Sequence, residues 1–127
     1  MTAEERMARR FLLAVSLVFL PIFAIPLLLH PYGWARRFGW RDEPETDVGR
    51  YFGRCLGAVA VALMGGALAA SRDPREHRSL FTVLEAGGWL LSAVHLRGLV
   101  EQRQPPIENA EVAGYAAFAL LARRCRP

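Results

Sequence analysis

Two long stretches of the chain carry almost no charge. Residues 11–29 contain no charged side chain, and residues 51–70 contain a single one, Arg54. A soluble fold of 127 residues cannot bury two such stretches, whereas a helix that crosses a bilayer core needs about 20 apolar residues. The pattern predicts a small polytopic membrane protein. It excludes a disulfide-stapled secreted scaffold, a disordered tail and an ordinary cytosolic enzyme.

Four apolar segments are separated by short polar breaks. The expected membrane spans cover residues 11–30, 51–70, 79–97 and 107–122. The fourth span is the shortest, because its cleanly apolar part, residues 112–122, is only eleven residues long. We expect an all-α fold, a four-span antiparallel transmembrane helix bundle that forms one domain over residues 1–127.

Proline and acidic residues indicate where the helices bend and begin. Pro21 and Pro26 should kink the first span, which helices in lipid tolerate where neighbours satisfy the freed carbonyl groups. Asp47 is the expected cap of the second span. Residues 73–76, Asp-Pro-Arg-Glu, have the spacing of a capping box, so the third helix is expected to begin at Pro74. The fourth helix should begin after the two prolines Pro105 and Pro106.

Aromatic and charged side chains alternate in the outer loop, residues 31–50. Aromatic rings beside arginines can stack on nucleic acid, but next to a membrane span they are typical of an interfacial belt. Trp34 and Phe38 are four residues apart, which predicts one apolar side for a short surface helix that begins at Pro31. We therefore expect contact with the lipid bilayer and none with nucleic acid.

All sixteen basic residues are arginine, and their distribution predicts the orientation. With the N-terminus inside, nine arginines lie on the cytoplasmic side and six on the outer side. Because cytoplasmic loops carry an excess of basic residues, we expect both termini in the cytoplasm and the chain in the cell inner (plasma) membrane. This orientation puts Cys55 near the outer face and Cys125 near the inner face, so the two are expected to be unpaired within one chain.

Small residues recur along the second span at the spacing that lets helices approach closely in lipid. They form two ridges, Gly53, Gly57, Gly65 and Ala69 on one side and Ala58, Ala62, Gly66 and Ala70 on the other. We expect these ridges to pack within one bundle; a dedicated dimer interface is the alternative.

A few ionisable residues are expected at membrane depth, where charge is expensive. Arg54 and Glu111 should lie at a similar depth below the outer surface, as an interhelical ion pair or, alternatively, in a substrate site. Glu85 is expected to be the most deeply buried acid. Either it fixes packing, protonated or hydrogen-bonded to Ser16 or to a freed carbonyl, or it binds and releases a proton or cation. Glu108 is expected in the first turn of the fourth helix, where the helix dipole favours an acid.

Two histidines are expected near the outer boundary, His30 at the end of the first span and His95 at the end of the third. Both are expected to be ordinary interfacial residues, with paired haem ligands in the bundle as the remote alternative. The sequence has no phosphate-binding loop, nucleophile elbow or zinc-protease motif. Its cysteines and histidines lack metal-ligand spacing. We therefore expect no enzymatic activity, cofactor or metal.

Three short motifs resemble those of small DoxX-like four-helix integral membrane proteins. They are Arg-Cys-Leu-Gly at residues 54–57, Asp-Pro-Arg at residues 73–75, and His-Leu-Arg-Gly at residues 95–98 followed by two prolines and an acidic helix. The resemblance covers most of residues 31–122. It implies a four-helix fold and a membrane location, and it transfers no catalytic residues.

The expected function is that of a small non-enzymatic membrane protein. It would pack with itself as a homo-oligomer or act as an accessory subunit of a larger membrane complex. The alternative is a small proton- or cation-coupled transporter that uses a buried carboxylate. The chain has the span number and length of small multidrug transporters, but it lacks the carboxylate that those carry in the first span.

Overall fold

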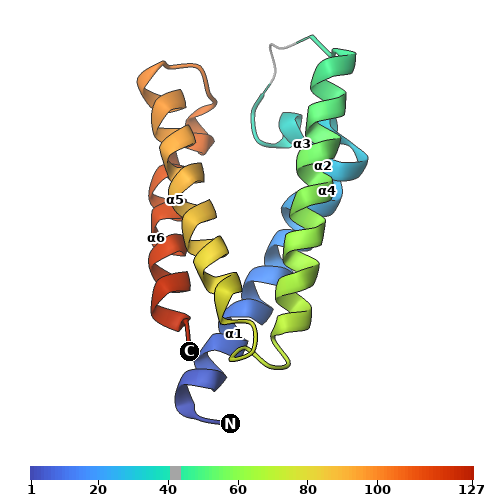
Figure 1. Cartoon of the computed structure of the whole chain (residues 1–127). Coiled ribbons are helices and arrows are strands. Elements are labelled where there is room, and N and C mark those ends of the chain that lie inside the picture. The colour runs from blue at the N-terminus through green and yellow to red at the C-terminus, as the bar shows by residue number, and fades with distance from the viewer. Residues whose placement is uncertain (41–43) are drawn as a thin grey trace. The chain divides into compact units, whose positions relative to one another are not determined.

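The computed structural model describes residues 1–40 and 44–127, which are helical and contain no strand (Figure 1). The elements are α1 (Ala3–Phe19), a π-helical turn (Leu20–Ala24), α2 (Ile25–Leu29), α3 (Pro31–Arg37), α4 (Asp47–Ala70), α5 (Arg78–Val100) and α6 (Pro106–Cys125). The predicted all-α class is therefore confirmed. Arg41, Asp42 and Glu43 of the predicted outer loop lie outside the described residues.

Within residues 1–40 and 44–127, three helical segments are long and apolar enough to cross a membrane. They are Ala3–Leu29, Asp47–Ala70 and Arg78–Val100. The chain is thus a helical protein with three candidate membrane-spanning helices, which indicates a multi-pass membrane protein. The helix α6, predicted as the fourth span, is 20 residues long and is more polar than the other three.

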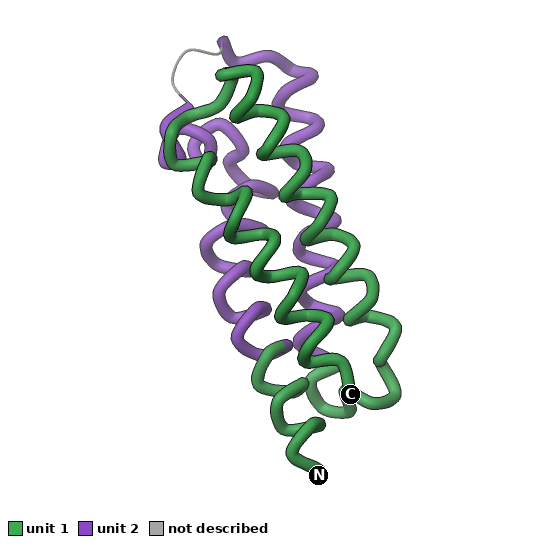
Figure 2. The backbone as a smooth tube through the Cα atoms, turned by 90° about the vertical axis from the view of Figure 1, so that its left-hand side faces the viewer, with its two compact units in different colours: residues 1–11, 70–127 green, residues 12–69 purple. Residues whose placement is uncertain are grey.

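The chain divides into two compact units (Figure 2). Unit 1 consists of residues 1–11 and 70–127, and unit 2 consists of residues 12–69. Unit 1 contains the hairpin of α5 and α6, which pack against each other along their length (Figure 1). Unit 2 contains the second half of α1 from residue 12, the proline-rich turns that follow it, and α4 up to residue 69.

The first helix begins well before the predicted span. The Glu5 amide donates to Thr2 Oγ1 over 3.1 Å, and the Thr2 amide donates to Glu5 Oε2 over 2.7 Å. This reciprocal pair is a capping box, which satisfies two amide groups at the helix start. The helix therefore begins at Ala3.

The predicted interruption of the first span is present at Pro21. Proline has no amide hydrogen to donate to the preceding turn, and the helix changes there to a π turn over Leu20–Ala24. The Ile25 amide donates to the Leu20 carbonyl, five residues back, and α2 then runs to Leu29. Wider turns of this kind accommodate an extra residue without ending the helix.

The outer loop contains the predicted short helix. It begins at Pro31, and the Trp34 and Phe38 rings pack with centroids 4.8 Å apart. After it, Glu45 lies between two arginines, 2.6 Å from Arg36 and 3.1 Å from Arg50. The hydrogen bond from Arg36 is the main cause that holds the pKa of the Glu45 carboxyl below its usual value.

The predicted cap of α4 is wrong by one residue. Thr46 caps the helix, because its Oγ1 accepts the Gly49 amide over 3.0 Å. The Tyr32 hydroxyl in turn accepts the Thr46 amide over 2.8 Å. Asp47 is instead the first helical residue, in the first turn, where the helix dipole favours an acid.

The predicted start of α5 at Pro74 is wrong by four residues. The Asp73 carboxylate does accept the Glu76 amide, over 3.3 Å, but this bond closes only an isolated turn. His77 then leaves the helical region, with φ −104° and ψ 29°, and α5 begins at Arg78. The helix α6 begins at Pro106, one residue before the predicted start, because a proline is tolerated in the first turn of a helix.

Glycines on α4 permit close packing inside unit 2. A Cβ added to Gly57 would lie 2.8 Å from the Leu27 carbonyl carbon and closer still to the Leu28 backbone. A Cβ on Gly53 would collide with the Pro31 ring. The predicted packing of small residues within the chain is therefore confirmed for Gly53 and Gly57, whereas the single four-helix bundle stays a prediction.

Candidate functional site

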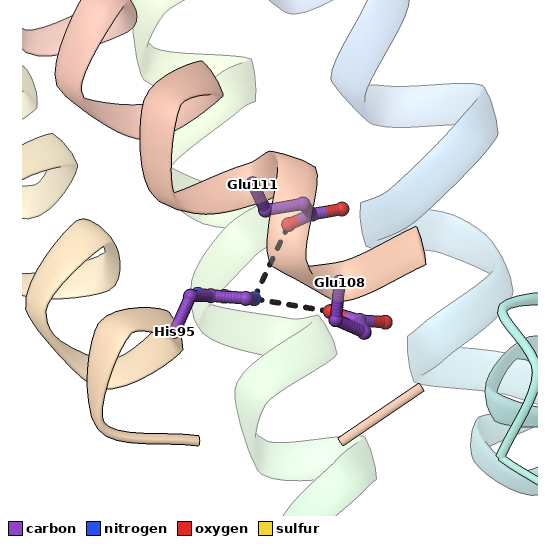
Figure 3. A group of neighbouring side chains, drawn as sticks. All are labelled: His95, Glu108 and Glu111. Carbon is purple, nitrogen blue, oxygen red and sulfur yellow. Dashed lines mark hydrogen bonds and ion pairs between the residues drawn. The ribbon is translucent and has the colours of Figure 1, made fainter. Parts of the chain in front are cut away.

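Three ionisable side chains meet at one end of the α5–α6 hairpin (Figure 3). His95 Nε2 lies 3.1 Å from Glu108 Oε2 and 3.3 Å from Glu111 Oε2. The exposed fractions of these side chains are 14% for His95, 5% for Glu108 and 31% for Glu111. We call these three residues the His-Glu-Glu cluster. One ligand atom from each lies within 4.8 Å of the others, so the cluster offers a nitrogen base and two carboxylates to a single point.

The local sequence aligns the two acids. Glu108 and Glu111 are three residues apart in the first turns of α6, so they share one helix face. His95 is near the C-terminal end of α5, which ends at Val100. The tight turn between the helices, which includes Gln102 at φ 53°, folds α6 back so that this face meets His95.

A glutamine side chain fixes this end of the hairpin. Gln104 Nε2 donates to the His95 carbonyl oxygen over 3.0 Å and to Asn109 Oδ1 over 2.8 Å. The Gln104 amide fits there because Gly98 has no side chain, since a Cβ at this position would collide with it. Deeper in the hairpin, the Ser92 hydroxyl donates to the Val112 carbonyl over 2.7 Å.

The orientation of the imidazole follows from its hydrogen bonds. His95 Nδ1 is 2.7 Å from the Leu91 carbonyl oxygen. A carbonyl oxygen only accepts, so Nδ1 carries a hydrogen and donates it. Nε2 is then the atom directed at the two carboxylates. The Tyr115 ring packs on the imidazole with centroids 5.1 Å apart and holds the ring in place.

The other predicted site residues lie elsewhere. Arg54 is exposed on α4 in unit 2, so its predicted ion pair with Glu111 joins two units and stays a prediction. Glu85 is half-buried on α5, so the prediction that it is the most deeply buried acid is wrong, because Glu108 is buried. Its predicted partner Ser16 belongs to unit 2, where the Ser16 hydroxyl donates to the Met64 carbonyl over 3.0 Å.

The two predicted haem ligands differ in their surroundings. His30 is exposed between α2 and α3. His95 is half-buried, with Leu91 at one ring nitrogen and the two glutamates at the other. The haem alternative stays a prediction. Cys55 and Cys125 are both free thiols, the first exposed and the second buried.

The sequence patterns do not predict the His-Glu-Glu cluster as a unit. They indicate an interfacial position for His95, a partner in Arg54 for Glu111 and only a helix-dipole role for Glu108. The available signal was the Glu-x-x-Glu spacing directly after a helix-breaking turn, with a histidine shortly before that turn.

Comparison with protein-family models, with curated proteins and with solved structures finds no match to this chain. The resemblance to DoxX-like proteins therefore stays a prediction.

Proposed function

We propose that this chain is a non-enzymatic membrane protein with four spans and cytoplasmic termini. It assembles with copies of itself or serves as an accessory subunit of a larger membrane complex. The three candidate spans support the membrane location. A four-helix fold of this kind agrees with the resemblance to DoxX-like proteins.

Two observations support α6 as the fourth span. Its 20 residues extend about 30 Å at 1.5 Å per residue, which is the thickness of a bilayer core. Its two acids, Glu108 and Glu111, are directed at His95 of α5. Polar side chains that face a neighbouring helix are the kind that a membrane span tolerates.

The observation that carries the assembly proposal is an uncovered small-residue face on α4. Gly53 and Gly57 are covered by the same chain, but no atom lies within 4 Å of a Cβ added to Gly65 or Gly66. Neighbouring alanines are exposed on the same side. In lipid, such a face lets a second helix approach closely. We call it the open face of α4; it consists of Ala58, Ala62, Gly65, Gly66 and Ala69.

Energy transfer between labelled copies in liposomes tests self-assembly. Donor- and acceptor-labelled wild-type protein should show transfer that falls as lipid dilutes it, whereas Gly66→Ile should lose most of this transfer at equal dilution. Gly114→Ile is the matched control, because a Cβ on Gly114 also meets no atom within 4 Å; it should behave as wild type.

The accessory-subunit form of the proposal is tested in cells. A photo-crosslinker at Ala62 should capture a specific membrane protein, and Gly66→Ile should abolish this capture. The assembly proposal is wrong if wild type neither self-associates nor gives a product that Gly66→Ile removes.

A coupled transporter is the second candidate, and Glu85 favours it. This acid is half-buried on a candidate span, and among the described residues of its own unit it forms no hydrogen bond or ion pair. Proton-driven uptake or efflux in proteoliposomes should then be present in wild type and lost in Glu85→Gln, which keeps the shape but cannot carry the charge. Absence of flux in wild type, or its survival in Glu85→Gln, contradicts this candidate.

A further inference from the structure

We propose that the His-Glu-Glu cluster binds one divalent transition-metal ion between α5 and α6. This site goes beyond the assembly function and does not depend on it. The ion would join the two helices of the hairpin near its turn.

The two distances from His95 Nε2 to the carboxylate oxygens match those of a coordination shell, and the two carboxylate oxygens lie within 4.8 Å of each other. Metal–nitrogen and metal–oxygen bonds of about 2.1 Å place neighbouring ligand atoms about 3.0 Å apart in an octahedral shell and about 3.4 Å apart in a tetrahedral one. His95 Nε2 is 3.1 Å from Glu108 Oε2 and 3.3 Å from Glu111 Oε2. One ion can therefore contact all three atoms after small side-chain rotations.

The imidazole is prepared to act as a ligand. Because Nδ1 donates to the Leu91 carbonyl oxygen over 2.7 Å, the lone pair of a neutral His95 is on Nε2, which is directed at the carboxylates (Figure 3). Metal-binding histidines commonly donate their other ring nitrogen to a carbonyl or carboxylate in this way. Gln104 and Gly98 hold the surrounding backbone in place without taking part in binding.

Charge and ligand type define the class of ion. Two carboxylates that bind a metal as anions contribute a charge of −2, which a divalent cation neutralises. One imidazole nitrogen with two carboxylates suits Zn²⁺, Mn²⁺ or Fe²⁺. Soft copper(I) favours sulfur ligands, whereas Mg²⁺ and Ca²⁺ favour all-oxygen sites.

The site keeps a side open to water. Glu108 is almost fully buried, but 31% of the Glu111 side chain is exposed. Three protein ligands leave at least one coordination position, which water can fill from the Glu111 side. The ion can therefore enter and leave without unfolding the hairpin.

Calorimetric titration of the full chain with Zn²⁺ tests the proposal. The protein is purified in mild detergent without a histidine tag, stripped with a chelator and returned to buffer. Wild type should bind one Zn²⁺ per chain, and its melting temperature should rise on binding. Glu111→Gln and His95→Gln should each weaken binding by at least about tenfold. Mg²⁺ should not compete at equal concentration.

Two variants keep the result interpretable. Glu101→Gln is the matched control, since Glu101 is an exposed acid of the same hairpin that pairs with Arg97; its Zn²⁺ affinity should equal that of wild type. Glu111→Gln is the primary variant because Glu111 is the more exposed of the two acids, and circular dichroism checks that it is folded. The proposal is overturned if wild type shows no saturable binding, or if Glu111→Gln and His95→Gln bind Zn²⁺ as wild type does. Equal competition by Mg²⁺ would overturn the assigned ion class.

Discussion

Glycine has two opposite roles along α4, and the difference lies in what surrounds each Cα. At Gly57 the backbone of Leu27 and Leu28 occupies the space that a Cβ would need, whereas at Gly66 that space is empty. A backbone segment moves aside for an added methyl group less readily than the end of a flexible side chain does. The same residue type is therefore required for folding at one position and available for assembly at the other.

Gly57→Ala should lower the free energy of unfolding by about 1–3 kcal/mol, because the methyl group overpacks a contact with backbone. Gly66→Ala is the matched control on the same helix, and it should cause no loss. Denaturant titration in detergent, followed by circular dichroism, measures both. Equal stability of the two variants would contradict the packing described for unit 2.

The Cys125 thiol should react slowly with maleimides. Burial raises the pKa of this thiol, and the neighbouring Arg124 offsets only part of that effect. The thiolate is the reactive form, so at pH 7.5 less of it is present in the folded chain than in the unfolded chain. The rate of maleimide labelling of Cys125 in the folded chain should rise about tenfold per pH unit until the pH passes the raised pKa of the thiol.

The control for Cys125 is the same thiol in protein unfolded with denaturant, where its pKa returns to the ordinary value. Labelling is quantified by mass spectrometry of the C-terminal peptide. Equal rates for folded and unfolded protein at pH 7.5 would show that Cys125 is not shielded.

At the scale of elements, local signals predicted some helix starts and missed others. Pro31 begins α3 as expected, and Pro106 begins α6 one residue before the expected start. A proline fixes its own backbone angle and is tolerated in the first turn of a helix. Caps are less decisive, since several nearby hydroxyl and carboxylate groups compete for the same amides. For this reason Thr46, and not Asp47, caps α4. The hydrogen bond that Asp73 accepts from the Glu76 amide closes a turn without starting a helix.

The site could be predicted only in part. Periodicity places Glu108 and Glu111 on one face of α6, but the register between two helices depends on where small residues let them touch. Gly88 sets such a point, since a Cβ there would lie 2.9 Å from Ala119 Cβ and 3.0 Å from the Tyr115 carbonyl oxygen. That contact is 27 positions or more along the chain from Gly88 and leaves no local pattern that brings His95 opposite Glu108.

Gly88→Val should loosen the α5–α6 hairpin. The added side chain meets the Tyr115 backbone and Ala119, so we expect a loss of about 1–3 kcal/mol and faster hydrogen exchange along α6. Gly87→Val is the adjacent control, because a Cβ there meets no atom within 4 Å. Hydrogen exchange with mass spectrometry compares the two. Protection of α6 in Gly88→Val equal to that in Gly87→Val would contradict the described contact.

At the scale of the whole molecule, the predicted Arg54–Glu111 ion pair would connect unit 1 with unit 2. A double-mutant cycle with Arg54→Ala and Glu111→Ala tests it in thermal melts. Residues that interact give a coupling energy of about 0.5–3 kcal/mol, whereas independent residues give additive losses. Strict additivity would show that the two side chains do not meet, and the charge of Glu111 would then be balanced within its own hairpin.

The number of spans determines where the C-terminus lies, and three of the four are candidates by length and composition. If α6 crosses the membrane, the turn at Gln102 and the C-terminal Pro127 lie on opposite sides. If α6 remains on the outer surface, the two lie on the same side. The position of the C-terminus therefore separates four spans from three.

The most direct test is labelling of single cysteines by a membrane-impermeant maleimide. Each cysteine replaces Thr2, Gln102 or Pro127 in a chain in which Cys55 and Cys125 are changed to Ser. In intact cells the cysteine at position 102 should be labelled, and those at positions 2 and 127 should be labelled only after the membrane is permeabilised. Labelling of position 127 in intact cells, together with position 102, would contradict the four-span account.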